Sequence, residues 1–296
     1  MILSPPRLTP SLLLILGLLP ASEAGAQTAI AVDPALPRRG TLVRLTVAPS
    51  APETVTELLG EIAEEPLHFR STDGVTWTSL AGIPIGGDDS LPFPVIVVRG
   101  GIRDTIHASI AVIKADYPSE RLRVAPRMAE PDSAARRRIA RETRRARAAS
   151  RAAHTTEQLW TEPFELPRDD RITSEYGTGR EYNGKILSRH LGTDFAGAVG
   201  APVRATNRGR VVLVDNFYLA GRVVYLNHGD GIVSAYFHLS RALVKLGETV
   251  ERGQLIGRVG QSGRVTGPHL HWVMRYGGTT LDPMSVMALL GVRSEE

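Results

Sequence analysis

Histidines are concentrated in the second half of the chain, and histidine is the side chain that most often binds metals or transfers protons near neutral pH. Two of them, His269 and His271, flank one leucine in the segment GPHLHWVM, residues 267–274. Side chains two residues apart on a β-strand project to the same face, so we expect both imidazoles on one face, with Leu270 and Trp272 on the other. Taken alone, this pair fits a polar strand face as well as a metal site. Six of the eight histidines lie at positions 154, 190, 228, 238, 269 and 271.

A second candidate pair is His190 and Asp194 in the segment SRHLGTDFAG, residues 188–197. A spacing of four residues would align the two side chains on a helix, but Gly192 and Gly197 disfavour a helix here. We expect instead a loop that turns at Gly192 and runs into a strand, which would bring the imidazole and the carboxylate together. The H-x-x-x-D pattern alone is a weak signal, because such pairs arise by chance in many chains.

The two pairs are informative in combination. His190, Asp194 and one histidine of the H-x-H pair would supply three ligands and leave a fourth tetrahedral position open, as catalytic zinc sites do. His238, in the segment SAYFHLS, and the other histidine of the pair would then stay unligated. One of these could take a proton from water and the other could stabilise charge on an attacked carbonyl oxygen. Because the chain has no cysteine, thiolate ligands and thiol nucleophiles are excluded.

Four separated motifs resemble those of the lysostaphin/LytM-type zinc metallopeptidases, which are bacterial endopeptidases of peptidoglycan. The motifs are HLGTDFA, NHGDGIVSAYFHLS, GETVERGQLIGRVGQSG and TGPHLHW, in this order and at this spacing. The resemblance covers roughly residues 160 to 290, and the combination of four motifs makes it specific. It implies an active peptidase with one zinc ion per chain, acting on the peptide stems and cross-links of the bacterial wall.

The same resemblance implies roles that the spacing leaves open. His190 and Asp194 match the two zinc ligands of the family's H-x-x-x-D motif, and His271 matches the third ligand, the second histidine of H-x-H. His269 then matches a catalytic residue that is not a ligand, with His238 as its partner. Strand geometry places the two histidines of the H-x-H pair on one face without ranking them.

Three other classes of protein are alternatives to this metallopeptidase family. A biotinyl or lipoyl carrier presents a modifiable lysine at a tight turn, whereas Lys245 precedes the hairpin-like segment VKLGETVERGQLIGRVG. A zincin shows H-E-x-x-H on a helix, and this pattern is absent. The alternative that stays open is a non-catalytic peptidoglycan-binding or amidase-activating protein with a structural zinc site. The complete set of family histidines favours the enzyme.

The elements that position these residues are expected to be mainly β. Frequent glycines and short strands from Trp160 onward predict an antiparallel β domain over residues 160–296, with VKLGETVERGQLIGRVG as its clearest hairpin. The resemblance implies a metallopeptidase domain of the duplicated hybrid, barrel-sandwich type. Residues 27–124 contain the strand-like segments TLVRLTVAPS, GVTWTSLAGI, PVIVVRG and ASIAVIKA, which predict an N-terminal immunoglobulin-like β-sandwich.

A basic helical linker is expected between the two domains, over residues 125–159. Its segment PDSAARRRIARETRRARAASRAA, residues 131–153, is rich in alanine and arginine and contains no glycine and no internal proline. We expect an exposed helix with Ser133 as its N-cap. A solvated connector is the simpler interpretation, and a helix resting on an anionic polymer or membrane surface is the alternative.

Three histidines are interpreted as structural. His68 and His107 lie in the N-terminal region without a partner at ligand spacing. His228, in NHGDG, recurs in the family that the chain resembles, but it adjoins a turn. A buried turn histidine usually satisfies backbone groups.

The N-terminus resembles a secretory signal peptide, predicted over residues 1–26. Arg7 precedes the apolar run LLLILGLL, and Ala24 and Ala26 fit the A-x-A rule for cleavage. We therefore expect cleavage near Ala26, export to the periplasm or cell envelope, and no stable membrane anchor. The net charge of +4 is mostly local to the arginine-rich helix and indicates no nucleic-acid partner. The oligomeric state is left open.

Overall fold

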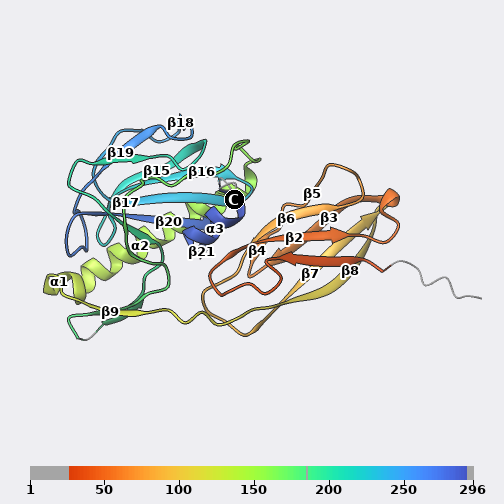
Figure 1. Ribbon diagram of the computed structural model, residues 1–296, viewed down its shortest axis with the longest axis horizontal. Coiled ribbons are helices and arrows are strands. Elements are labelled where there is room, and N and C mark those ends of the chain that lie inside the picture. Colours follow the sequence, from red (N-terminus) through yellow and green to blue (C-terminus); the bar gives the residue numbers. More distant parts are fainter. Residues whose placement is uncertain (1–26, 185, 292–296) are drawn as a thin grey trace, which may run out of the picture.

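The computed structural model describes residues 27–184 and 186–291, which fold mainly as β-strands (Figure 1). This confirms the predicted fold class. The predicted signal peptide, residues 1–26, lies outside the described residues. Among the residues that the structure describes, no helix combines the length and the apolar character needed to cross a membrane.

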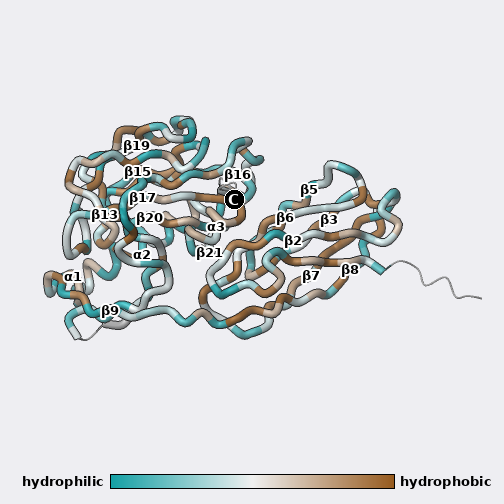
Figure 2. Tube along the Cα trace, in the orientation of Figure 1, coloured by the Kyte–Doolittle hydropathy of each residue, from teal (hydrophilic) through white to brown (hydrophobic). Residues whose placement is uncertain are grey.

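Two four-stranded antiparallel sheets make up the N-terminal region. In sheet order, they are β1 (Ala29–Asp33), β2 (Leu42–Ala48), β6 (Trp77–Gly82) and β5 (Arg70–Ser71), and β4 (Glu65–Pro66), β3 (Val55–Ile62), β7 (Ser90–Arg99) and β8 (Ile102–Ala111); the 3-10 turn η1 (Pro52–Thr54) precedes β3. Each of the four segments expected to be extended contains a strand. Alternate side chains such as Val43, Leu45 and Val47 enter a core shared by both sheets, and Figure 2 shows hydrophobic residues recurring along these strands. The immunoglobulin-like topology stays a prediction.

A ten-stranded sheet forms the C-terminal region, and all its strand pairs are antiparallel, as predicted. One face of this sheet buries Phe195, Tyr236 and Trp272 in the main core, together with Val286 of helix α3 (Pro283–Leu290). The strands in sheet order are β10 (Ile172–Ser174), β13 (Thr193–Ala196), β20 (His269–Tyr276), β17 (Ile232–Ala242), β16 (Gly221–Gly229), β15 (Gly209–Phe217) and β18 (Thr249–Val250), joined by β14 (Pro202–Arg204), β19 (Leu255–Val259) and β21 (Thr279–Leu281).

The predicted hairpin in VKLGETVERGQLIGRVG is wrong. The chain does reverse at residues 251–254, but β18 pairs with β15, whereas β19 pairs with β14 and β17. Val250, Ile256 and Val259 from the two strands are all buried in the main core. Burial against different neighbours therefore decides the pairing, and the local turn does not.

The basic segment forms helix α2 (Ser133–Arg151), with α1 (Pro126–Ala129) before it and the 3-10 turn η2 (Ala152–Thr155) after it. The predicted N-cap is wrong by one residue. Asp132 is the cap, and its carboxylate accepts a hydrogen bond of 2.7 Å from the N–H of Ala135. A carboxylate satisfies this free N–H and also interacts favourably with the helix dipole.

Helix α2 packs on the second face of the ten-stranded sheet, beside β20 (Figure 1). Glu142, Ala146 and Ser150 are spaced by four residues and are buried along one side of the helix. Ala146 joins a second core that includes Val273 of β20, and the Glu142 carboxylate accepts a hydrogen bond from the N–H of Tyr218 at 2.8 Å. The interpretation of this helix as a solvated connector is therefore wrong for this side.

A small three-stranded sheet connects the chain ahead of α2 to the C-terminal region. Its order is β12 (Ile186–Arg189), β11 (Gly179–Tyr182) and β9 (Ser119–Leu122). Strand β9 runs parallel to β11, with Glu120 opposite Arg180. A segment that precedes α2 by about ten residues thus forms the edge of a sheet in the C-terminal region.

A buried polar cluster joins the N-terminal sheets to the C-terminal region. Glu65 is 2% exposed, and its Oε2 lies 3.0 Å from Nε2 of His154. The Nδ1 atom of His154 lies 2.8 Å from Nε2 of His68, and Arg151 donates to Oε1 of Glu65. His68 is therefore a structural residue of this contact between the two regions.

We expect the melting temperature to fall as the pH is lowered from 7.5 to 5.5, in part because of His68. Burial lowers the pKa of His68 below its usual value of 6.5, so below pH 6.5 the unfolded chain takes up a proton more readily than the folded chain. The contribution of neutral His68 to the free energy of unfolding is thus fully present above pH 6.5, and it is lost as the pH falls toward the pKa of His68 in the folded protein. Thermal denaturation of the wild type and of His68→Gln across this range tests the prediction. The variant should show a shallower pH dependence, and identical slopes would contradict it.

Candidate metal centre

Most of the candidate site lies on three adjacent strands of the ten-stranded sheet, which are β13, β20 and β17. In the antiparallel pairing of β13 with β20, Asp194 lies directly opposite His271, and Ala196 lies opposite His269. Directly opposed residues project to the same face with their Cβ atoms about 5 Å apart. Leu270 and Trp272 are fully buried in the main core on the other face. The alternation predicted for β20 therefore aims both histidines away from the core.

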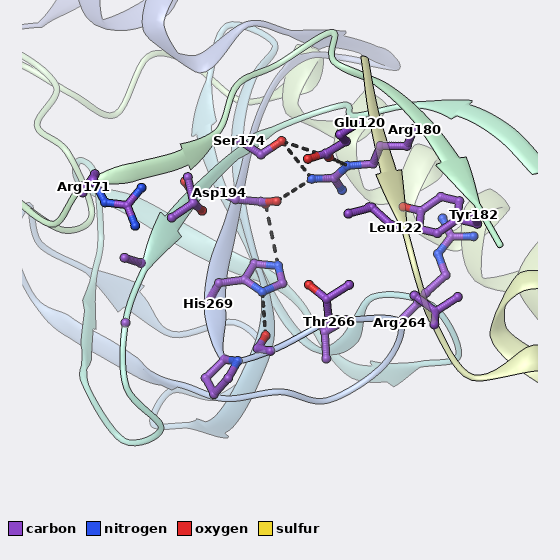
Figure 3. Close-up of a pocket in the computed structure, with 17 residues that line it drawn as sticks. Glu120, Leu122, Arg171, Ser174, Arg180, Tyr182, Asp194, Arg264, Thr266 and His269 are labelled. Carbon is purple, nitrogen blue, oxygen red and sulfur yellow. Dashed lines mark hydrogen bonds and ion pairs between the residues drawn. The ribbon is translucent and has the colours of Figure 1, made fainter. Parts of the chain in front are cut away.

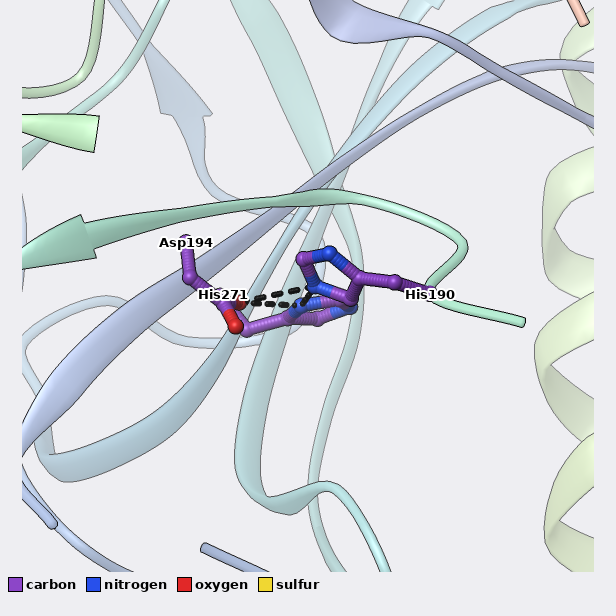
Figure 4. A group of neighbouring side chains, drawn as sticks. All are labelled: His190, Asp194 and His271. Atoms are coloured by element: carbon purple, nitrogen blue, oxygen red, sulfur yellow. Dashed lines mark hydrogen bonds and ion pairs between the residues drawn. The ribbon is translucent and has the colours of Figure 1, made fainter. Parts of the chain in front are cut away.

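His190, Asp194 and His271 meet at one point (Figure 4). Nε2 of His190 lies 2.9 Å from Oδ1 of Asp194 and 2.8 Å from Nδ1 of His271. Nδ1 of His271 lies 2.7 Å from the same carboxylate oxygen. His190 is held by its backbone, which exchanges hydrogen bonds with Gly177 and Thr178 in the preceding turn. The three residues are 1%, 5% and 8% exposed, in sequence order, so water cannot readily satisfy their side chains.

The chemistry of this group fits a bound cation. Nδ1 of His190 lies 2.8 Å from the carbonyl of Glu175, which can only accept, so the ring hydrogen resides on Nδ1. In the neutral form that a metal ligand requires, Nε2 of this ring carries a lone pair, and it faces the carboxylate oxygen of Asp194. Two lone pairs at this separation repel one another unless a positive charge lies between them. Two imidazole nitrogens and one carboxylate oxygen are the ligand types that zinc accepts in catalytic sites.

The ionisation states also suit metal binding. Burial alone would raise the pKa of Asp194, but the two neighbouring imidazoles, His271 and His190, hold it well below its usual range. Burial lowers the pKa of His271 to about 4. At neutral pH the carboxylate is therefore ionised and the imidazole of His271 is neutral, as metal ligands must be.

Arg180 holds the far side of the Asp194 carboxylate. Its guanidinium donates to Oδ2 of Asp194 and to Oε1 of Glu120, each at 2.6 Å, and to Oγ of Ser174 at 3.1 Å (Figure 3). Oδ1 of Asp194 stays directed toward the two imidazoles. A continuous chain of charged contacts thus links the candidate metal ligand to Glu120 on β9.

His238 reaches the site through a bulge in β17. Phe237 and His238 together lie opposite Val223 of β16, and His238 has a left-handed backbone conformation, with φ of 60°. Neighbouring residues on a regular strand would face opposite ways. Here the ring centroids of Phe237 and His238 lie 5.2 and 5.8 Å from that of His271. Strand alternation alone would have placed one of these two rings on the wrong face.

His238 and His269 form a second imidazole pair beside the three-residue cluster, with ring centroids 4.8 Å apart. Nδ1 of His238 lies 2.8 Å from the carbonyl of Ser262, and Nδ1 of His269 lies 2.9 Å from the carbonyl of Gly267. These carbonyls fix a ring hydrogen on Nδ1, so Nε2 is the atom of each ring that can accept or return a proton. Burial, with His269 and His271 nearby, lowers the pKa of His238 well below its usual range.

The remaining histidines lie outside this site. His228 is buried, with Nδ1 2.7 Å from the carbonyl of Arg208 and Nε2 2.8 Å from Oγ of Ser234. Both of its ring nitrogens are therefore occupied within the fold. His107 is exposed on β8, and His68 and His154 lie at the contact between the two regions.

A groove of about 380 Å³ opens beside the cluster (Figure 3). Asp194 and His269 line it, together with Arg171, Arg180 and Arg264. On the other side of the cluster, a largely apolar hollow lies between α2 and the sheet, and His271 lines it. The candidate metal centre thus separates a cationic groove from an apolar hollow on the same face of the sheet.

Gly192 permits the close approach of the chain to His271. A Cβ atom at this position would lie 2.5 Å from the carbonyl oxygen of Trp272 and 2.8 Å from Nε2 of His271. Both distances are too short for a methyl group. We expect Gly192→Ala to lower zinc affinity by roughly 10- to 100-fold, the range typical of changes that reorient a metal ligand.

Competition with a chromophoric zinc chelator measures the effect of Gly192→Ala. Gly267→Ala is the matched control, because a Cβ there meets nothing within 4 Å. It should keep the wild-type affinity. An equal loss in both variants, or none in either, would show that the tight contact at Gly192 does not shape the metal centre.

Several residues that complete the site carry no recognisable signal in the sequence. Arg180 is one of many arginines, and no spacing rule connects it with Asp194. Glu120 was assigned to the N-terminal domain. The backbone carbonyls of Glu175, Ser262 and Gly267 carry no side-chain signature at all. Only the strand pairing and the loop paths bring these groups to the histidines.

The part of the chain that contains the candidate site is also the part that resembles known protein families. Residues 188–283 match peptidase family M23. The peptidoglycan DD-endopeptidase ShyA of Vibrio cholerae serotype O1 is 43% identical over 115 residues, which are 38% of this chain and 27% of that protein. The DD-carboxypeptidase/endopeptidase Mpg of Neisseria meningitidis serogroup B is 39% identical over 116 residues, which are 39% of this chain and 27% of that protein. The matched part therefore spans well under two thirds of either relative.

One solved structure resembles most of the chain. It is described as a candidate M23 peptidase from Pseudomonas aeruginosa, and it matches with a TM-score of 0.63 and 25% sequence identity. The match covers 87% of this chain and 96% of that chain. The likeness therefore extends beyond residues 188–283 into the preceding β-strands.

Proposed function

We propose that the C-terminal part of this chain, of which residues 188–283 match peptidase family M23, is a peptidase domain, and that the protein is an exported, zinc-dependent endopeptidase that cuts peptide cross-links of bacterial peptidoglycan. The observation that carries the proposal is the convergence of His190, Asp194 and His271 next to two imidazoles with free Nε2 atoms. The names of ShyA and Mpg lead us to expect a D,D bond, that is, a cross-link formed through D-alanine.

We assign the zinc ligands as His190, Asp194 and His271, with one ion per chain. When bound there, zinc would supply Lewis-acid activation of a water molecule and of the scissile carbonyl. Arg180 holds Oδ2 of Asp194 and leaves Oδ1 free for the ion. The carbonyl of Glu175 fixes the tautomer of His190 that presents Nε2. These second contacts orient the ligands before the metal arrives.

The catalytic roles are assigned to His238 and His269. Their ring hydrogens are held on Nδ1 by backbone carbonyls, so each ring can accept a proton at Nε2. One ring takes the proton of the attacking water, and the other, once protonated, stabilises the negative charge on the carbonyl oxygen. The depressed pKa of His238 keeps it unprotonated at neutral pH.

The rest of the chain is proposed to deliver this domain to the wall. We assign residues 1–26 to a cleaved signal peptide, 27–124 to the N-terminal β domain, 125–159 to the basic linker and 160–296 to the peptidase domain. The substrate polymer lies in the cell envelope, so the location fits the proposed export. Peptidoglycan peptide stems and cross-links are the proposed partners.

The test is digestion of purified, cross-linked peptidoglycan with zinc content measured alongside. We expect the wild type to convert cross-linked muropeptide dimers to monomers, a chelator to abolish this activity, and added zinc to restore it. Liquid chromatography with mass spectrometry identifies the bond that is cut. Full zinc occupancy without any cleavage would favour a peptidoglycan-binding or amidase-activating protein with a structural metal.

A further inference from the structure

Arg264 occupies an unusual position in the cationic groove. Its guanidinium carbon lies 4.0 Å from the ring centroid of Tyr182, which is buried on β11. The backbone N–H of Arg264 donates to the carbonyl of Leu219 at 2.8 Å, which anchors the loop that carries it. The side chain is half-buried. Arg264 is thus a positioned guanidinium on an aromatic platform, and it is not a freely moving surface arginine.

This positive charge has no carboxylate partner among the described residues. The two acidic residues that line the groove, Glu120 and Asp194, are both paired with Arg180. Burial and the nearby Arg180 both disfavour the charged form and lower the pKa of Arg264. Placing an unpaired charge in such a position is costly unless a ligand compensates it.

The groove connects this charge to the reacting groups. The segment that carries Arg264 continues to His269, and both side chains line the same groove as Asp194 (Figure 3). An anionic group held by Arg264 would therefore belong to the molecule whose amide is attacked beside His269. A guanidinium matches a carboxylate with two parallel hydrogen bonds, which fixes orientation as well as charge.

Resting on the proposed peptidase function, we propose that Arg264, supported by Tyr182, binds a free carboxylate on the residue that carries the scissile nitrogen. Two kinds of wall peptide share this chemistry. One is a cross-link whose amine donor is a diamino acid with its own carboxylate next to the amide. The other is an uncross-linked stem that ends in D-alanyl-D-alanine. A cross-link made through a lysine side chain or a glycine amide lacks the adjacent carboxylate or places it elsewhere.

The test compares two substrates that differ only in this group. One is a purified dimer cross-linked through D-alanine to a diamino acid with a free carboxylate, and the other is the same dimer with that carboxylate converted to the primary amide. We expect the wild type to cut the carboxylate form with a kcat/KM roughly 10- to 100-fold higher, as charged hydrogen bonds imply. Arg264→Gln should cut both forms at the slow rate, with unchanged zinc content. Arg264→Lys should keep part of the preference.

Arg171→Gln is the matched control, because Arg171 lines the same groove but is exposed and lies apart from Tyr182 (Figure 3). It should keep the preference for the carboxylate form. The proposal is overturned if the wild type cuts both substrates equally, if Arg264→Gln slows both by the same factor, or if Arg171→Gln removes the preference. Failure of the zinc-loaded wild type to cut either substrate would instead overturn the peptidase function, and this proposal with it.

Discussion

His271→Ala is expected to lose both bound zinc and cross-link hydrolysis, whereas His269→Ala should keep most of the zinc and still lose hydrolysis. Nδ1 of His271 lies 2.7 Å from Oδ1 of Asp194, within the three-atom cluster. Nε2 of His269 lies 3.8 Å from the same oxygen, outside the cluster but beside it. Loss of a ligand removes the metal, while loss of a positioned acid–base group slows the reaction by roughly 100- to 10,000-fold.

Zinc content by atomic absorption and the rate of muropeptide release separate the two effects. His107→Ala serves as the control, because His107 is exposed on β8, far along the chain from the site, and should change neither quantity. Equal loss of zinc in the two variants would make His269 a ligand. If both variants still cut cross-links, the assignment of the site is wrong.

Arg180→Met should weaken zinc binding by roughly 10- to 100-fold, although Arg180 would not touch the ion. In the wild type, the Arg180 guanidinium donates to Oδ2 of Asp194 and to Oε1 of Glu120, each at 2.6 Å. The substitution removes this shared donor from both carboxylates. The Asp194 carboxylate is then free to turn away from His190. Arg180→Lys should fall between, because an ammonium keeps the charge but not the fork that bridges two carboxylates.

Arg121→Met provides the comparison for this loss. Arg121 lies next to Glu120 on β9, but its side chain is 87% exposed and pairs with Glu181. It should bind zinc like the wild type in a chelator competition. Glu120→Gln should have a smaller effect than Arg180→Met, since Asp194 keeps its partner. Wild-type affinity in Arg180→Met would mean that the fold holds Asp194 without help.

Local patterns in the sequence predicted the strands around the site but not which strands pair with one another. The alternation around Leu270 and the turn at Gly192 were enough to predict two strands and the direction of their side chains. The position of Asp194 directly across from His271 depends on which strands become neighbours, and nothing local encodes that choice. The same limit explains the wrong hairpin, where burial of Ile256 in the main core outweighed the turn.

Two further features escaped prediction for different physical reasons. The bulge at His238 breaks strand alternation, so the period of two would not have shown which face this ring takes. Helix α2 has a thin apolar side, and it docks through small and polar residues such as Ala146 and Glu142, which sequence alone does not distinguish from solvent-exposed ones. The charged composition correctly predicted that the outer side of this helix is exposed, but it gave no sign that the other side is buried against the sheet.

The position of β9 bears on which part of this chain can be moved into a fusion protein with the candidate metal centre intact. The matched segment, residues 188–283, contains the candidate ligands and catalytic histidines, yet Glu120 and Arg180 lie outside it. A fusion that transplanted only residues 160–296 would carry every residue expected to perform chemistry and would leave behind the strand that steadies Arg180. The transferable segment therefore begins ahead of Ser119, and an exchange of the N-terminal region at a later position would alter the candidate metal centre itself.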